Sequence, residues 1–319
     1  MNSSACDSPG ARWGDDVSSS RKSQLERQLR SGIATRLDSR SLPLFADFPL
    51  DGADVFWLAM QFFNHDGELG QAVNRHSLFA VQPETARLST DLSELHLEQA
   101  RLCDACLEMA VLTGIHLAGA DLSHAVLRGA ILDAADLRGA ELYGANLTGV
   151  LMVYTVLDGA DLSDAILCDA VLDETGLRNA SLVRADLRRA KMCRADLRGA
   201  DLRDANLERA NLEGAILDSS SVVKGARLNE ATLAHIALSG TDLRGIEWDG
   251  VQQLGEEALA EEPYNAAGEP KSERTRNNQY HLAIHTYTRL STALYAQGLE
   301  VHARRFELRA HELIKRLRR

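Results

Sequence analysis

Residues 185–214 read ADLRR AKMCR ADLRG ADLRD ANLER ANLEG, six consecutive copies of one five-residue phrase. The same period extends in both directions, since every fifth residue from Leu92 to Val222 is a large aliphatic one. Of these 27 positions, 24 hold Leu. Two residues before each lies a second set of 27 positions, of which 20 hold Ala. A repeat this regular decides the fold class before any other feature of the sequence does.

The five-residue period fits neither of the common regular structures. An amphipathic helix needs apolar residues three and four apart, and a half-buried strand needs strict alternation. Within each unit, however, Ala and Leu are two residues apart, so both point to the same side of an extended segment. Each unit is therefore predicted to be a short extended side with Ala and Leu facing inward, followed by a corner.

This string of units resembles the pentapeptide-repeat family, whose consensus is Ala-(Asp/Asn)-Leu-x-x. The resemblance covers residues 86–250. It implies an all-β solenoid, a right-handed quadrilateral β-helix in which four units make one coil, with about eight coils here. The stacked Leu side chains are expected to stabilise it, each by about 1.5–3 kcal/mol when fully buried. The period slips at residues 219–224 and then resumes from Leu228 to Trp248, which predicts a bulge or a short loop at one corner.

The flanking sequences differ in composition from the repeats and predict further segments. The aromatic residues that precede the repeats favour a helical cap over the first coil, because an open coil end exposes unpaired backbone groups. Apolar residues at helical spacing near the C-terminal end of the chain, interrupted by Gly298, favour an α-helical hairpin. The predicted segments are a disordered tail with a short amphipathic helix (1–40), the N-terminal cap (41–85), the β-helix (86–250), a linker (251–275) and the hairpin (276–319).

Composition and charge limit the function. The formal net charge of -11 argues against general binding to nucleic acid, which depends on Lys and Arg neutralising phosphates. Five cysteines, an odd number, indicate a reducing compartment, and Cys103-x-x-Cys106 lacks the second pair that a zinc site needs. Residues 1–20 contain no apolar stretch, so a secretory signal is not expected. We expect a cytoplasmic protein with no membrane span, no metal and no cofactor.

If four units make a coil, residues twenty apart stack on one face, and the residue before each central Leu points outward. One such column is acidic and consists of Asp121, Glu141 and Asp161, with Asp158, Asp164 and Asp169 nearby. The opposite column is apolar and consists of Val111, Ile131, Leu151 and Val171, joined by Tyr154. The acidic column is either the ordinary Asp/Asn preference of the repeat or a binding surface. The apolar column is either covered by a terminal segment or marks an intermolecular contact.

No catalytic arrangement is visible in the sequence, so we do not expect an enzyme. A regular solenoid offers flat sides rather than the concave pocket of a small-molecule site. His96, His116 and Asp136 share a column, but exposed side chains explain this better than a metal site does.

Two functions of different classes remain. The resemblance implies a protein partner, because some members of the family mimic duplex DNA and bind type II topoisomerases, protecting them from poisons and so conferring antibiotic resistance. The partner would be DNA gyrase or topoisomerase IV, without direct binding to nucleic acid or membrane, and with a homodimer as one option. The alternative is a generic protein–protein interaction scaffold, or a secreted effector, with no topoisomerase role. Residues 86–175 hold 15 acidic and 4 basic residues, whereas residues 176–227 hold 7 and 11, so the repeats are expected to be acidic near their start and basic further on.

Overall fold

The structure is a computed structural model, and it describes residue 23 and residues 97–105, 107–265 and 267–318. The tail and helix predicted over 1–40, the cap predicted over 41–85 and the first repeats to residue 96 lie outside the described residues. The chain divides into two compact units between Ala165 and Ile166. Each unit is described by itself below.

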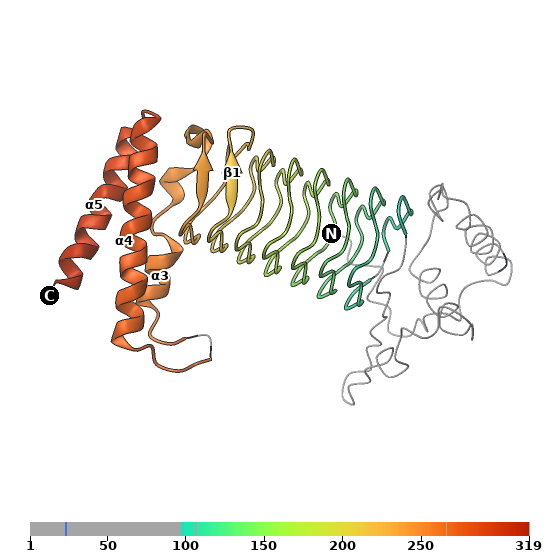
Figure 1. Cartoon of the computed structure of the whole chain (residues 1–319), viewed down its shortest axis with the longest axis horizontal. Coiled ribbons are helices and arrows are strands. Elements are labelled where there is room, and N and C mark those ends of the chain that lie inside the picture. Colours follow the sequence, from blue (N-terminus) through green and yellow to red (C-terminus); the bar gives the residue numbers. More distant parts are fainter. Residues whose placement is uncertain (1–22, 24–96, 106, 266, 319) are drawn as a thin grey trace. The chain divides into compact units, whose positions relative to one another are not determined.

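The repeats of the first unit form stacked coils in which residues twenty apart pair in parallel (Figure 1). Val111 pairs with Ile131 and Ile131 with Leu151, and the other sides of the coil repeat this spacing. The backbone supplies the bonds: the Leu112 N–H donates to the Ile131 carbonyl at 2.7 Å, and the Ile131 N–H donates to the Ala110 carbonyl at 2.9 Å. The spacing of twenty confirms that four five-residue units make one turn of this repeat β-helix.

Each five-residue repeat ends in a tight turn, and this turn explains why its Ala and Leu can both be buried. The Ala130 N–H donates to the Leu127 carbonyl at 3.0 Å, which closes a four-residue turn. The third residue of the turn has positive φ, which suits Gly129 (φ 63°) but is costly for Ala134 (φ 57°). All central aliphatic side chains from Leu97 to Leu217 are buried, as is every Ala of the second set in the described residues.

The second unit is also built of stacked coils, and among its residues two short strands pair in parallel. Strand β1 is Ile216–Asp218 and β2 is Ala237–Ser239, with Ile216 opposite Ala237. The period slips within 219–224, as predicted, but Val222 is not a core residue, and its assignment to the central set was wrong. Val222 is 40% exposed, whereas Val223 is buried and Ser221 takes the Ala position. The one extra residue is absorbed at 219–220, and Asp201 pairs with Val222, twenty-one residues on.

Among the described residues, two single-turn 3-10 helices lie at the end of the last coil and just after it, and three α-helices follow. Their bounds are η1 Leu243–Gly245, η2 Trp248–Gly250, α3 Gly255–Glu261, α4 Glu273–Ala296 and α5 Glu300–Leu317. Helices α4 and α5 lie where the sequence predicts a hairpin. The linker predicted over 251–275 is wrong in its first half, because α3 lies there and packs against α4. The count of about eight coils and the right hand of the coil stay predictions.

The three helices cover the last coil and form what we call the cap, residues 255–317. Trp248 is 2% exposed and meets the ring of Phe306 edge to face, with 5.6 Å between centroids. The Trp248 Nε1–H donates to the Leu243 carbonyl at 2.8 Å, which fixes the indole over the end of the core. The last Leu layers are thereby removed from water.

Candidate interaction surfaces

The predicted acidic column is present in the first unit. Parallel bridges join Asp121 to Glu141 and Glu141 to Asp161, so the three carboxylates share one face. The Asp121 and Asp161 carboxylates accept hydrogen bonds from the Ser123 N–H at 3.0 Å and the Ser163 N–H at 2.9 Å. These bonds hold the two side chains in place, so the column presents fixed negative charge at about 4.8 Å per coil.

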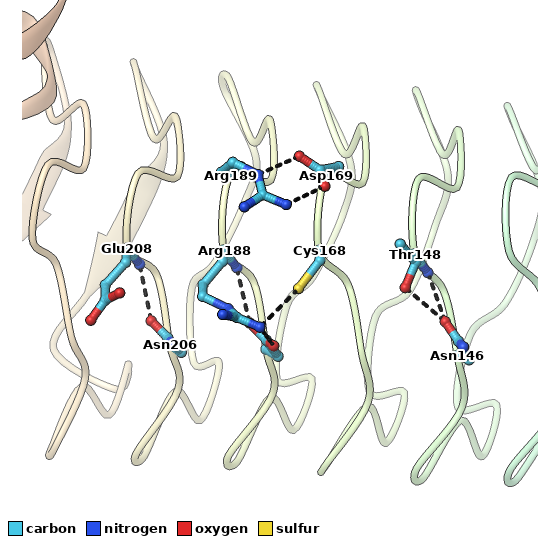
Figure 2. A network of polar contacts seen from close by, with 9 residues as sticks. Asn146, Thr148, Cys168, Asp169, Arg188, Arg189, Asn206 and Glu208 are labelled. Carbon is cyan, nitrogen blue, oxygen red and sulfur yellow. Dashed lines mark hydrogen bonds and ion pairs between the residues drawn. The ribbon is translucent and has the colours of Figure 1, made fainter. Parts of the chain in front are cut away.

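The other residues predicted to extend this column behave differently. Asp164 lies in the turn that ends the side begun by Asp161, whereas Asp158 belongs to the preceding side; both are half-buried. Asp169 lies in the second unit, where Arg189 donates to both of its oxygens at 2.7 and 2.6 Å (Figure 2). That hydrogen bonding lowers the pKa of Asp169 from its usual range. Asp169 is therefore charged but neutralised by Arg189.

The predicted apolar column is also present in the first unit. Val111, Ile131 and Leu151 follow one another through parallel bridges, and each is half-buried. Tyr154 follows Leu151 in the next turn and is 61% exposed, at φ 60°. Val171 belongs to the second unit, where it pairs with Lys191; its place in the apolar column stays a prediction.

Most Arg side chains in the coils of the second unit form ion pairs. Within the phrase Asp-Leu-Arg, the Arg188 guanidinium donates to the Asp186 carboxylate at 2.6 and 2.8 Å, and it also contacts the Cys168 thiol (Figure 2). The Asp196 carboxylate accepts from two guanidinium groups, those of Arg178 and Arg198, which hold its pKa well below the usual range. Residues 176–227 hold 11 basic and 7 acidic residues, and ion pairs between residues two or about twenty apart occupy many of the Arg side chains. Further pairs join Arg194 to Glu174, Arg203 to Asp201 and Arg209 to Glu230.

The cap contains two buried carboxylates that the sequence did not indicate. Glu257 is 0% exposed; it accepts from the Tyr287 hydroxyl at 2.7 Å and forms a bidentate ion pair with Arg309. The Tyr287 hydroxyl in turn accepts from the Leu254 N–H at 2.9 Å. This chain of bonds ties α3, α4 and α5 together. In the sequence these glutamates stand in an acidic, apparently loop-like stretch, and nothing there shows that α3 buries them.

The Glu256 side chain accepts the hydrogen bond that a following coil would otherwise accept from the Leu233 N–H. Its Oε1 accepts from the Leu233 N–H at 2.8 Å and from the Thr286 hydroxyl at 3.3 Å, while its Oε2 is buried and has no hydrogen-bond partner among the described residues. Burial raises the pKa of Glu256 from its usual value of 4.5 to about 7. The bonds from Leu233 and Thr286 offset this only in part.

The raised pKa of Glu256 predicts a pH dependence of cap stability. The folded chain keeps the proton up to about pH 7, whereas the unfolded chain loses it near pH 4.5, so the folded state binds more protons in this window. The free energy of unfolding should therefore fall as pH rises from about 4.5 to about 7, by roughly 3 kcal/mol, and then level off. Glu256→Gln keeps the acceptor for Leu233 and should flatten this slope in urea unfolding at several pH values. An equally steep slope in the variant would contradict the assignment.

The described residues offer little for covalent or metal chemistry. The pKa values of the Cys103, Cys168 and Cys193 thiols are raised, mainly by burial, to about 11 for Cys193, which disfavours the nucleophilic thiolate. No group of three His, Cys, Asp or Glu side chains in the described ranges could hold a metal ion. Among those ranges, no helix combines the length and the apolar composition needed to cross a membrane.

Comparisons with known proteins agree with the repeat architecture. The model of "Pentapeptide repeats" matches eight copies, over residues 115–152, 155–192 and 180–218. No curated protein matches the chain.

Several solved structures are similar to the chain. The pentapeptide repeat protein Rfr23 of the cyanobacterium Cyanothece 51142 is 35% identical over 29% of this chain, with a TM-score of 0.29, and the match spans 63% of Rfr23, less than two thirds. HetL of Nostoc sp. strain PCC 7120, involved in heterocyst differentiation regulation, is 29% identical over 51% of this chain and 86% of its own, with a TM-score of 0.28. QnrB1, a plasmid-mediated fluoroquinolone resistance protein, is 21% identical over the same shares, with a TM-score of 0.39.

In each of the two compact units, the matched repeats lie within the stacked coils. Sequence period, backbone pairing and family model therefore describe the same element. The chain belongs to the pentapeptide-repeat family.

Proposed function

We propose that this chain is a non-catalytic cytoplasmic binding protein that uses the side faces of its β-helix to contact a protein partner, and that the partner is a type II topoisomerase. The acidic column of Asp121, Glu141 and Asp161 carries the proposal. A topoisomerase binds duplex DNA through Lys and Arg that neutralise phosphates, so a rigid row of carboxylates fits the same surface. The resemblance to family members that mimic DNA supplies the candidate.

The charge of the first unit supports this choice of face. Residues 97–165 carry ten acidic side chains against three Arg. In the second unit several acidic side chains outside the cap are paired with Arg, as in Asp186, Asp196 and Asp201. The end of the last coil is covered by the cap, so we infer that the partner meets a side face and not this end. Such electrostatic contacts mainly raise the association rate and should weaken with salt.

The experiment is a supercoiling assay with purified gyrase, with and without a fluoroquinolone, at roughly micromolar concentrations of the full chain. We expect inhibition of supercoiling or relief of the poison. Replacing Asp121, Glu141 and Asp161 together by Lys should raise the half-maximal concentration at least about tenfold, because like charges would then face each other. The matched control replaces three exposed acids of the second unit, Glu213, Glu247 and Asp249, by Lys, and should retain the effect.

The second candidate, a scaffold, rests on the apolar column of Val111, Ile131 and Leu151. Half-buried aliphatic side chains in a row, next to the exposed Tyr154, favour a protein contact. Leu151→Asp in the same assay separates the two: it leaves a topoisomerase effect intact if the acidic column makes the contact. No effect of the unchanged chain on gyrase, together with altered light scattering of Leu151→Asp, would replace the topoisomerase proposal by the scaffold.

A further inference from the structure

The last coil, residues 226–245, ends in backbone groups that in earlier coils pair with a following coil. On the side that contains β2, the earlier layers show which groups these are. The Leu197 N–H donates to the Ile216 carbonyl at 2.8 Å, and the Ala195 carbonyl accepts from the Ile216 N–H at 3.0 Å. Two layers further, the corresponding groups are the Leu238 N–H and the Ile236 carbonyl. Such an edge is a template for another strand unless something covers it.

Three of the four sides of the last coil are covered. On each of them, a backbone or side-chain group from the segment after residue 245 takes the role of the missing coil. The bonds are Glu247 N–H to Ala226 O (3.1 Å), Glu230 N–H to Gln253 O (3.0 Å), Gly255 N–H to Ala231 O (2.8 Å), Leu233 N–H to Glu256 Oε1 (2.8 Å), Leu243 N–H to Gln297 Oε1 (2.8 Å) and Gln297 Nε2–H to Thr241 O (2.8 Å).

The fourth side, residues 236–240, is left open. Within the described part of the chain, the Leu238 N–H has no hydrogen-bond acceptor on this edge. The Ile236 carbonyl has only a long contact, 3.4 Å, from the Arg289 guanidinium. Ser239 and Gly240 are exposed, so the edge is reachable from solvent. In the ranges that the structure describes, the segment after residue 245 makes no hydrogen bond shorter than 3.4 Å to this edge, whereas it makes bonds of 2.8–3.1 Å to each of the other three edges. This edge can therefore accept another strand.

A groove of about 300 Å³ lies at this edge, between β2 and α4. That volume is at the lower limit of ligand clefts, roughly 300–1,000 Å³. Its apolar lining includes Leu238, Leu290 and Ala293, and its polar lining includes His235, Thr286 and Arg289. The groove therefore offers backbone groups on one wall and small or aliphatic side chains on the other, the combination that an extended peptide needs.

The positive charge of Arg289 in the groove favours an acidic peptide. No carboxylate lines it, and Arg289 makes no ion pair with any acidic side chain of the described residues. The rings of His235 and His285 lie 6.1 Å apart at its margin. A peptide N–H that donates to the Ile236 carbonyl would replace the long contact from the Arg289 guanidinium. Arg289 could then form an ion pair with a carboxylate side chain of the peptide.

We propose that the open edge of β2 binds an extended, acidic segment of a partner protein as an added parallel or antiparallel strand. The Leu238 N–H donates to a peptide carbonyl, a peptide N–H donates to the Ile236 carbonyl, and Arg289 pairs with an Asp or Glu of the segment. Alternate side chains of the segment rest on Leu290 and Ala293. This site is separate from the acidic column, so it stands or falls without the topoisomerase proposal.

The probe is a library of fluorescein-labelled, acetylated pentapeptide amides with Glu at the centre and Val, Thr or Ala elsewhere, titrated into the full chain by anisotropy. We expect Glu members to bind about tenfold more tightly than the same peptides with a central Lys. Methylation of the peptide N–H that pairs with Ile236 should cost about tenfold. Bound peptide should slow hydrogen exchange at the Leu238 amide, measured by NMR. Arg289→Glu should reverse the preference from Glu to Lys.

Ala293→Trp fills the groove, and Thr292→Trp, on the exposed face of α4, is its matched control. The first should abolish binding and the second should not, with both variants checked for an unchanged melting temperature. The proposal is overturned if no library member binds at roughly millimolar concentration, or if Ala293→Trp binds as tightly as the unchanged chain. It is also overturned if binding leaves exchange at Leu238 unaltered.

Discussion

Replacing Arg309 by Met is expected to destabilise the cap by about 3–5 kcal/mol, since it leaves a buried carboxylate without its cation. Glu257 is 0% exposed, and its two oxygens are held by the Arg309 guanidinium and the Tyr287 hydroxyl. Hydrogen bonding to Glu257 raises the pKa of Arg309, so the guanidinium stays charged under all ordinary conditions. The Met side chain keeps most of the packing of the Arg stem but supplies no donor. The measurement is urea unfolding followed by far-ultraviolet circular dichroism, which reports the helices of the cap.

Two further variants show whether the loss comes from the buried charge. Arg304→Met, on the exposed face of α5, should change the free energy of unfolding by less than about 0.5 kcal/mol. Adding Glu257→Gln to Arg309→Met should recover at least half of the loss, because the amide still accepts from Tyr287 and carries no charge. If Arg309→Met proved as mild as Arg304→Met, the ion pair would have no structural role.

The period of five could predict the coil because it acts locally and repeatedly. Each Ala-x-Leu places two apolar side chains on one side of an extended segment, and the same turn follows each time, so one correct unit predicts all the others. The outward columns followed from this by arithmetic, and the bridges from Asp121 to Glu141 and from Val111 to Ile131 confirm them. The register slip was visible as well, although its assignment to Val222 was one residue off, because Val222 and Val223 are equally apolar.

The cap was harder to predict because it depends on contacts between residues far apart in the sequence. Glu256 and Glu257 stand in an acidic stretch that resembles a solvated linker. Only the fold brings Leu233, Tyr287 and Arg309 to them. Gln297, next to the helix-ending Gly298, resembles an ordinary surface residue, yet its amide replaces a backbone pair at Leu243 and Thr241. The open edge of β2 shares this origin: it becomes visible only when the other three edges are seen to be paired.

The core of the coils should respond to truncation with a similarly large loss. Leu187 is 0% exposed in the interior of the second unit, and Leu187→Ala is expected to lower the free energy of unfolding by about 3–5 kcal/mol. The loss combines the lost burial with a cavity that the rigid turn-and-bridge backbone cannot close. In a repeat fold this also weakens the layers above and below, since each coil is stabilised chiefly by its neighbours. Urea unfolding by circular dichroism measures it.

The chain itself offers the matched control for this variant. Met152 and Met192 occupy central positions of other units and are both 0% exposed, so the interior accepts an unbranched side chain of similar volume. Leu187→Met should therefore cost less than about 1.5 kcal/mol. Leu308→Ala, at a side chain that is 57% exposed on α5, should cost less than about 0.5 kcal/mol. A loss for Leu187→Ala no greater than that for Leu308→Ala would show that the stacked Leu layers do not stabilise the coil. The physical explanation of the five-residue period would then be wrong.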